Sequence, residues 1–196
     1  MEKLLESWRL FWLLAFAISA ANCLALPFTN FQSARGTVFI ILYSVRCALP
    51  FFLVAFTASS LAILWPSQST RWLLSNRRYI GLAFAFGMGW HLTFVAYTTF
   101  RFGNHLNRTA TTLDLIGLAF LLALTLTSFR PFARRLGPAG WRRLHKAGVY
   151  TIWLLATYIY LAGARDEDIF DIAALSILIA AWLLRAAAWT RIQLRR

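Results

Sequence analysis

The apolar residues of this chain fall into six long runs separated by short polar segments. The runs cover residues 8–26, a stretch within 37–65, and residues 79–100, 111–128, 147–164 and 169–189. A hydrocarbon core about 30 Å thick is crossed by a helix of roughly 20 apolar residues. Backbone polar groups find no partner in lipid, and the sequence has none of the alternation of a closed barrel. The pattern therefore predicts an all-α integral membrane protein, a bundle of six transmembrane helices.

The second run is too long for one upright span and contains Arg46 and Pro50. A proline is tolerated in the first turn of a helix, and an arginine deep in lipid is costly. We therefore expect the membrane helix to begin near Arg46 and to cover residues 46–65. Residues 37–44 would then lie along the interface or re-enter the membrane. A single tilted span is the alternative.

Composition agrees with the membrane assignment. The chain is 60% hydrophobic and 14% charged, against roughly 45–50% and 25% in soluble domains. The N-terminal segment has a longer apolar stretch than a usual signal peptide and no clear small-x-small cleavage site, so we interpret it as a retained span. No Rossmann glycine pattern or phosphate loop is present. The sequence therefore predicts a single transmembrane domain over residues 1–196, to which any nucleotide-binding domain would come from another protein.

Positive charge sets the predicted orientation. The net charge is +13, and the cations cluster in the segments between the apolar runs. That arrangement is typical of cytoplasmic loops rather than of a nucleic-acid-binding surface. With six spans, fourteen Lys and Arg residues fall on the side of the N-terminus and four on the other, while Arg46 and Arg185 lie at membrane edges. We therefore expect both termini in the cytoplasm and an attraction of the basic loops to anionic lipids of the bilayer.

Histidines are the main candidates for chemistry. His91 lies well inside the third run, where an ionisable residue indicates a functional site by default. It is either a ligand to haem iron or a side chain hydrogen-bonded to a neighbouring helix. His145 stands among cations at the cytoplasmic entry of the fifth run, as a ligand or as a solvated interfacial residue. We expect His105, in an outer loop, to be a surface residue.

Other classes of function fit less well. Carboxylates are nearly absent from the runs, which disfavours a Ser-His-Asp hydrolase and proton-coupled transport. Cys23 and Cys47 both fall near outer helix ends, and an oxidising compartment would permit a disulfide there, although spacing alone does not establish one. Gly81, Gly87 and Gly89 suit close packing of the third helix.

Two segments carry a family pattern, RWLLSNRRYIGLAFAFGMGWHLT and LTSFRPFARRLGPAGWRRLHKAGVYTIW, and SVRCAL is a weaker echo. Over roughly residues 44–163 they resemble the ferric-reductase-like transmembrane family, nearest its MsrQ (YedZ) branch. The resemblance implies a six-helix protein of the bacterial inner membrane that binds heme b and relays electrons between a quinone or flavin and a partner, another membrane or periplasmic protein. It places the haem-binding candidates at His91 and His145, with Arg78 in the basic pair. Where that branch has a further haem histidine, thirteen residues after the second, this chain has Tyr158.

Helix geometry predicts that these four residues lie at two depths. His91 and Tyr158 each follow a cytoplasmic-edge residue, Arg78 or His145, by thirteen positions, which is roughly 20 Å along a helix. His91 would therefore share a level with Tyr158, and His145 with Arg78, so neither level offers a pair of histidines. Two functions stay open: an electron relay with haem, as the membrane subunit of an oxidoreductase, and a haem-free accessory or structural subunit of a larger membrane complex.

Overall fold

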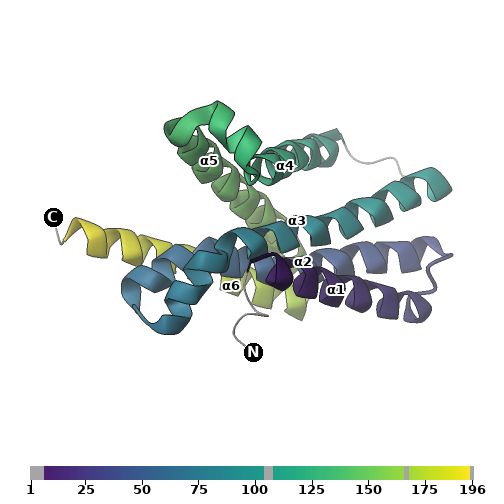
Figure 1. The fold of residues 1–196 in the computed structure, drawn as a ribbon. Coiled ribbons are helices and arrows are strands. Elements are labelled where there is room, and N and C mark those ends of the chain that lie inside the picture. The colour runs from purple at the N-terminus through teal and green to yellow at the C-terminus, as the bar shows by residue number, and fades with distance from the viewer. Residues whose placement is uncertain (1–6, 104–107, 166–167, 195–196) are drawn as a thin grey trace. The chain divides into compact units, whose positions relative to one another are not determined.

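The computed structural model of the protein describes residues 7–103, 108–165 and 168–194 (Figure 1). Its regular elements are all helical: α1 (Ser7–Ala25), the short 3-10 helix η2 (Leu26–Phe28), α2 (Ala34–Leu64), α3 (Gln68–Phe102), α4 (Arg108–Thr127), α5 (Arg130–Arg165) and α6 (Ile169–Gln193). Within these ranges, five helices are long and apolar enough to cross a membrane, and α4 contributes a shorter apolar stretch, Thr112–Thr127. The prediction of an all-α membrane protein is confirmed at this level. His105 lies outside the described residues.

Helix α2 begins much earlier than the sequence suggested. Ser33 caps its start, because the Ser33 hydroxyl accepts a hydrogen bond from the Gly36 amide at 3.0 Å, as is common at helix N-termini. Thr37 and Ser44 are fully buried, and their hydroxyls donate to carbonyls of the same helix. The helix therefore begins at Ala34 and not near Arg46, and residues 37–44 are part of it. The interfacial position of residues 37–44 stays a prediction. The alternative of one long helix describes this segment.

Pro50 lies inside α2 rather than in its first turn. The helix has 31 residues, so it is roughly 46 Å long and exceeds the thickness of a hydrocarbon core. Pro50 has no N–H to donate, yet such a proline is tolerated in a membrane helix when the neighbouring groups satisfy the backbone.

The chain divides into two compact units that α2 passes through in turn. Unit 1 comprises Met1–Ala55 and Trp72–Leu106, and unit 2 comprises Phe56–Arg71 and Asn107–Arg196. Helix α1, the first part of α2 and α3 from Trp72 onward therefore belong to unit 1. The end of α2 joins α4, α5 and α6 in unit 2. The single domain over residues 1–196 stays a prediction.

In unit 1, α3 runs parallel to α1. The Trp8 and Tyr79 rings meet edge to face at 5.4 Å, and further along both helices the Trp90 indole donates to the Ser19 hydroxyl at 3.1 Å. Nearer the start of both helices, the amide of Ser7 donates to the side chain of the buried Asn76. Residue numbers therefore increase in the same direction along α1 and α3.

The first part of α2 runs antiparallel to α3. A Cβ atom added at Gly87 would lie 2.9 Å from the Ala48 Cβ, and one at Gly81 would lie 4.0 Å from the Ala55 Cβ. Small residues on both sides permit this approach of the two backbones. Nothing lies within 4 Å of the corresponding position at Gly89, so that glycine does not serve close packing as expected.

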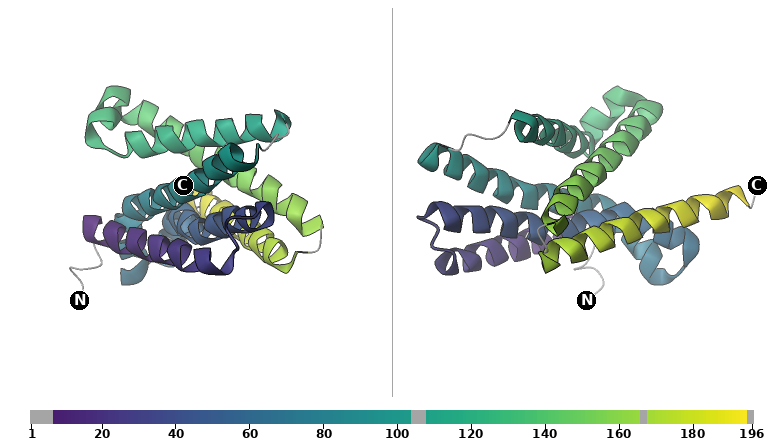
Figure 2. Two further views of the ribbon diagram at one scale, coloured as in Figure 1. Left: turned by 90° about the vertical axis from the view of Figure 1, so that its right-hand side faces the viewer. Right: turned by 180° about the vertical axis from the view of Figure 1, so that it is seen from behind.

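In unit 2, α5 packs antiparallel against α4 and then α6 (Figure 2). The α4–α5 approach uses glycines, because a Cβ atom at Gly148 would lie 3.0 Å from Leu124 and one at Gly117 would lie 3.1 Å from Leu155. The Trp153 indole of α5 donates to the Leu178 carbonyl of α6 at 3.0 Å. These contacts fix the register of three consecutive helices.

Two arginines of α6 bind the end of α2 in the same unit. Arg185 donates to the Phe56 carbonyl at 2.6 Å, and Arg191 donates to the carbonyls of Ile63 and Leu64. The last carbonyls of a helix, here those of Ile63 and Leu64, have no intrahelical donor, and an arginine such as Arg191 suits them. Residue number rises together on both partners, so the end of α2 and α6 run parallel.

Candidate functional site

His91 lies on α3 and faces α2. Its ring Nδ1 is 3.2 Å from the carbonyl oxygen of Ile41 and 3.5 Å from the Ser44 hydroxyl oxygen. The Ser44 hydroxyl already donates to the same carbonyl at 2.7 Å. A carbonyl only accepts, so Nδ1 of His91 carries the proton of this hydrogen bond.

This hydrogen bond fixes the tautomer of His91. In a neutral imidazole with a proton on Nδ1, the lone pair is on Nε2. Histidines that bind a metal almost always donate their other ring N–H to a carboxylate, a backbone carbonyl or water, which orients the ring. His91 is therefore oriented as a histidine that could hold haem iron would be, and the same hydrogen bond also suits a histidine that only joins α2 to α3.

Neighbouring contacts hold this part of α3 in place. One turn before His91, Gly87 meets Ala48 of α2, and Trp90 is hydrogen-bonded to Ser19 of α1. Phe94, three residues further, is buried and lies 5.6 Å from the Trp90 ring. The ring of His91 therefore stands on a backbone that both α1 and α2 constrain.

His145 has a different set of contacts, on α5 in unit 2. Its Nε2 is 3.0 Å from the hydroxyl oxygen of Thr127, at the end of α4, and its ring stacks on Trp141 at 4.1 Å. The Trp141 indole in turn donates to the Thr127 carbonyl at 3.0 Å. His145 and Trp141 therefore both join α5 to the last turn of α4.

The second hydrogen bond of the Thr127 hydroxyl shows which group donates in its contact with His145. It donates to the Ala123 carbonyl at 2.6 Å, so Nε2 of His145 donates to it in return. Nε2 of His145 is then occupied by a protein contact, and binding iron through this atom would break it. His145 thus fits a structural role better than the ligand role that the resemblance implied.

Arg78 and Tyr158 complete the four predicted residues. The Arg78 guanidinium lies 6.0 Å from the Trp8 ring and 5.5 Å from the Tyr79 ring, near the start of α1. Tyr158 lies on α5 with 58% of its surface exposed. Unit 1 thus holds His91 and Arg78, and unit 2 holds His145 and Tyr158. The predicted pairing of these residues by depth stays a prediction.

No family model, no curated protein and no solved structure matches this chain. The resemblance to ferric-reductase-like proteins therefore rests on the quoted segments alone.

Heme b can be tested against the residues present. His91 would be the residue that holds the haem iron, because its Nδ1–H is held by a backbone carbonyl. It is the one histidine among the described residues of unit 1. In the parts of the chain that the structure describes, no group of three or more His, Cys, Asp or Glu residues could hold a metal ion. The fit is therefore to a single histidine ligand, not to a complete pair.

The sequence did not identify the role of Arg185. Its guanidinium lies 4.4 Å from the Phe56 ring centre and 5.0 Å from that of Tyr150, and its Nε donates to the Tyr150 hydroxyl at 3.3 Å. A cation over aromatic faces gains most where water is excluded. The one sequence signal for this role is the position of Arg185 inside an apolar run. The prediction from the sequence places Arg185 at a membrane edge instead.

The two cysteines are both free. Cys23 is exposed on α1, and Cys47 is partly buried on α2, one turn after Tyr43. The disulfide that an oxidising compartment would permit is not formed in this structure.

Proposed function

We propose that this protein is a multi-pass membrane protein that binds heme b through His91 and relays electrons across the bacterial inner membrane to or from a partner protein. The observation that carries the proposal is the hydrogen bond from Nδ1 of His91 to the Ile41 carbonyl. It orients the ring and leaves the lone pair on Nε2, as in histidines that bind a metal. The quoted sequence segments that resemble ferric-reductase-like proteins also support it.

Haem, when bound, would supply one-electron chemistry through its iron. The residues of this chain would hold and orient the haem. The Ile41 carbonyl would fix the imidazole, and the contacts of Gly87 with Ala48 would keep α2 and α3 at constant separation. A rigid ligand suits electron transfer, which proceeds best when the site does not rearrange. A quinone or flavin donor and the partner protein follow from the resemblance alone.

The proposal includes six crossings with both termini in the cytoplasm. The end of α2 and α6 run parallel, and the chain between them forms α3, α4 and α5. Parallel neighbours in a membrane need an odd number of crossings between them, which supports a crossing by α4 despite its shorter apolar stretch. The excess of Lys and Arg supports the orientation.

Optical spectra of two variants test which histidine holds the haem. We expect purified His91→Ala to lose the Soret band of the wild-type protein. His145→Ala is the matched control and should keep the band, because the Nε2 of His145 is bonded to Thr127. Loss of the band in His145→Ala with retention in His91→Ala would overturn the assignment.

A second candidate is a haem-free accessory or structural subunit of a larger membrane complex. The observation that favours it is the use of His145 and Trp141 to join α4 to α5. A histidine with that role shows that this chain employs imidazoles for packing, and His91 could serve α2 and α3 in the same way. Stable co-purification with a complex, in a colourless preparation, would favour this candidate over the first.

A further inference from the structure

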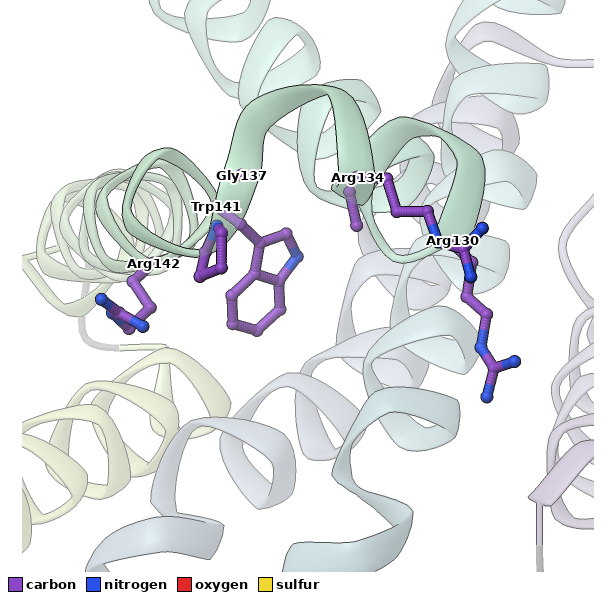
Figure 3. Close-up of a pocket in the computed structure, with 7 residues that line it drawn as sticks. Arg130, Arg134, Gly137, Trp141 and Arg142 are labelled. Carbon is purple, nitrogen blue, oxygen red and sulfur yellow. The ribbon is translucent and has the colours of Figure 1, made fainter.

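A pocket of about 550 Å³ lies where α5 bends, at the start of that helix (Figure 3). The charged residues that line it are Arg130, Arg134 and Arg142, and none of its lining residues is acidic. All of the lining belongs to unit 2. Neither proposed function uses this pocket.

The bend in α5 creates the pocket. Gly137 has φ 66° and ψ 167°, a backbone conformation that interrupts the helix, and Pro138 begins the next segment. Glycine adopts this conformation readily, and a proline is favoured at the first helical position. Arg130 and Arg134 precede the break and Arg142 follows it. Figure 3 shows the Trp141 side chain between Arg142 and Arg130.

Trp141 forms a fixed wall of the pocket. Its indole N–H donates to the Thr127 carbonyl at 3.0 Å, and its ring stacks on His145 at 4.1 Å. These contacts hold the indole in place before any ligand arrives. A wall that is ordered in advance lowers the entropic cost of binding.

The arginines indicate the charge and shape of the ligand. Figure 3 shows Arg130 and Arg134 on the same side of Trp141, and they lie about one helical turn apart. Two cations placed in this way repel each other unless an anion lies between them. Guanidinium forks match the oxygens of a phosphate, to which they donate two parallel hydrogen bonds. The pocket is therefore suited to a phosphate group.

The apolar part of the lining indicates that this phosphate belongs to an amphiphile. Ala133, Pro138 and Trp141 line the same space. Phe132 and Leu136, on the same segment, expose 41% and 43% of their surfaces. Tryptophan is enriched at membrane interfaces, and basic pockets on the cytoplasmic side bind anionic headgroups. A soluble phosphate would leave these apolar side chains without a partner.

We propose that this pocket binds the phosphate of an anionic phospholipid headgroup. Arg130 and Arg134 donate to the phosphate oxygens, and Trp141 packs against the glycerol and the adjoining acyl carbons. Arg142, on the other side of Trp141, adds positive charge at the edge of the pocket. The lipid thereby holds the bend of α5 at the membrane surface. This site does not depend on haem.

Native mass spectrometry of the full-length protein in phosphatidylcholine nanodiscs, titrated with phosphatidylglycerol, tests the proposal. We expect wild-type protein to retain phosphatidylglycerol in preference to phosphatidylcholine. Loss of two charge-assisted contacts in Arg130→Gln/Arg134→Gln should weaken this binding roughly 100-fold. The matched control is Arg135→Gln/Arg143→Gln, which removes the same charge from exposed positions outside the pocket. Screening at physiological salt should keep its loss within about threefold.

Three outcomes would overturn the proposal. Equal losses in the two double variants would mean diffuse attraction to the bilayer rather than a site. An absence of preference for phosphatidylglycerol in the wild-type protein would exclude the site without recourse to variants. Displacement of the lipid by excess inorganic phosphate would mean that the pocket takes free phosphate. Retention of lipid in excess phosphate, with the expected difference between variants, supports the lipid site.

Discussion

Three polar side chains in the described helices of this protein are bonded to backbone or hydroxyl oxygens. His91 donates to the Ile41 carbonyl, His145 to the Thr127 hydroxyl, and Arg185 to the Phe56 carbonyl. Lipid offers no partner for such groups, so an unsatisfied one is costly. Each of these residues therefore has a defined orientation, and single substitutions can separate a structural role from a chemical one.

Thr127→Val removes the acceptor for His145 and keeps the shape of the side chain. We expect a loss of about 1 kcal/mol in the free energy of unfolding, typical of one hydrogen bond. Thr125→Val is the control, because the Thr125 hydroxyl donates to the Leu121 carbonyl of its own helix. Unfolding by denaturant in micelles measures both variants. Equal stability of Thr127→Val and wild type would contradict the structural role of His145.

Arg185→Met removes the contacts of α6 with Phe56 and Tyr150 while it keeps a long apolar side chain. Charged hydrogen bonds and cation–π contacts away from water are each worth about 2 kcal/mol. We expect a loss of about 2 kcal/mol or more, measured by the same unfolding method. Arg143→Met, at an exposed position of α5, should have no measurable effect. A result in which both variants behave alike would show that Arg185 is not held as described.

The sequence identified some of these residues but not their partners. His91 stood out because it is ionisable and lies within an apolar run. Its bond to Ile41 could not be predicted, since nothing in one sequence specifies the register between α2 and α3. The stacking of Trp141 on His145 was easier to predict from the sequence, because residues four apart lie on one helix face.

At the scale of elements, glycines determine how closely the helices approach. Gly87 allows α3 to meet Ala48 of α2, and Gly148 allows α5 to meet Leu124 of α4. The sequence predicted the helices from their apolar runs, but it gave the start of α2 wrongly. The sequence signal for the observed start of α2 is Ser33, an N-cap residue. The cost of an arginine in lipid instead favours a later start near Arg46. The sequence also could not distinguish Gly87 from Gly89.

Substitution of these two glycines tests the α2–α3 contact. Gly87→Ala places a Cβ atom 2.9 Å from that of Ala48, and such overpacking costs typically about 1–3 kcal/mol. Gly89→Ala is the matched control, because nothing lies within 4 Å of its Cβ position. It should be neutral or slightly stabilising, since alanine favours helix over glycine. Thermal unfolding in detergent compares the two. Destabilisation by Gly89→Ala alone would refute the packing.

At the scale of the whole molecule, six crossings with both termini in the cytoplasm require α4 to cross the membrane. Cysteine reporters at Arg101 and Arg135, exposed positions before and after α4, test this in a variant without Cys23 and Cys47. In intact spheroplasts an impermeant maleimide should label Arg101→Cys and leave Arg135→Cys unlabelled until the membrane is permeabilised. Labelling of both from one side would mean that α4 does not cross.

The central claim is that one haem is bound by the histidine that α2 and α3 hold in place. The pyridine haemochrome absorbance of purified wild-type protein, divided by its polypeptide concentration, tests it most directly. The account predicts about one heme b per chain, because unit 1 contributes His91 as the one histidine among its described residues. A folded, colourless wild-type protein that gives no haemochrome after expression with an ample supply of haem would contradict it.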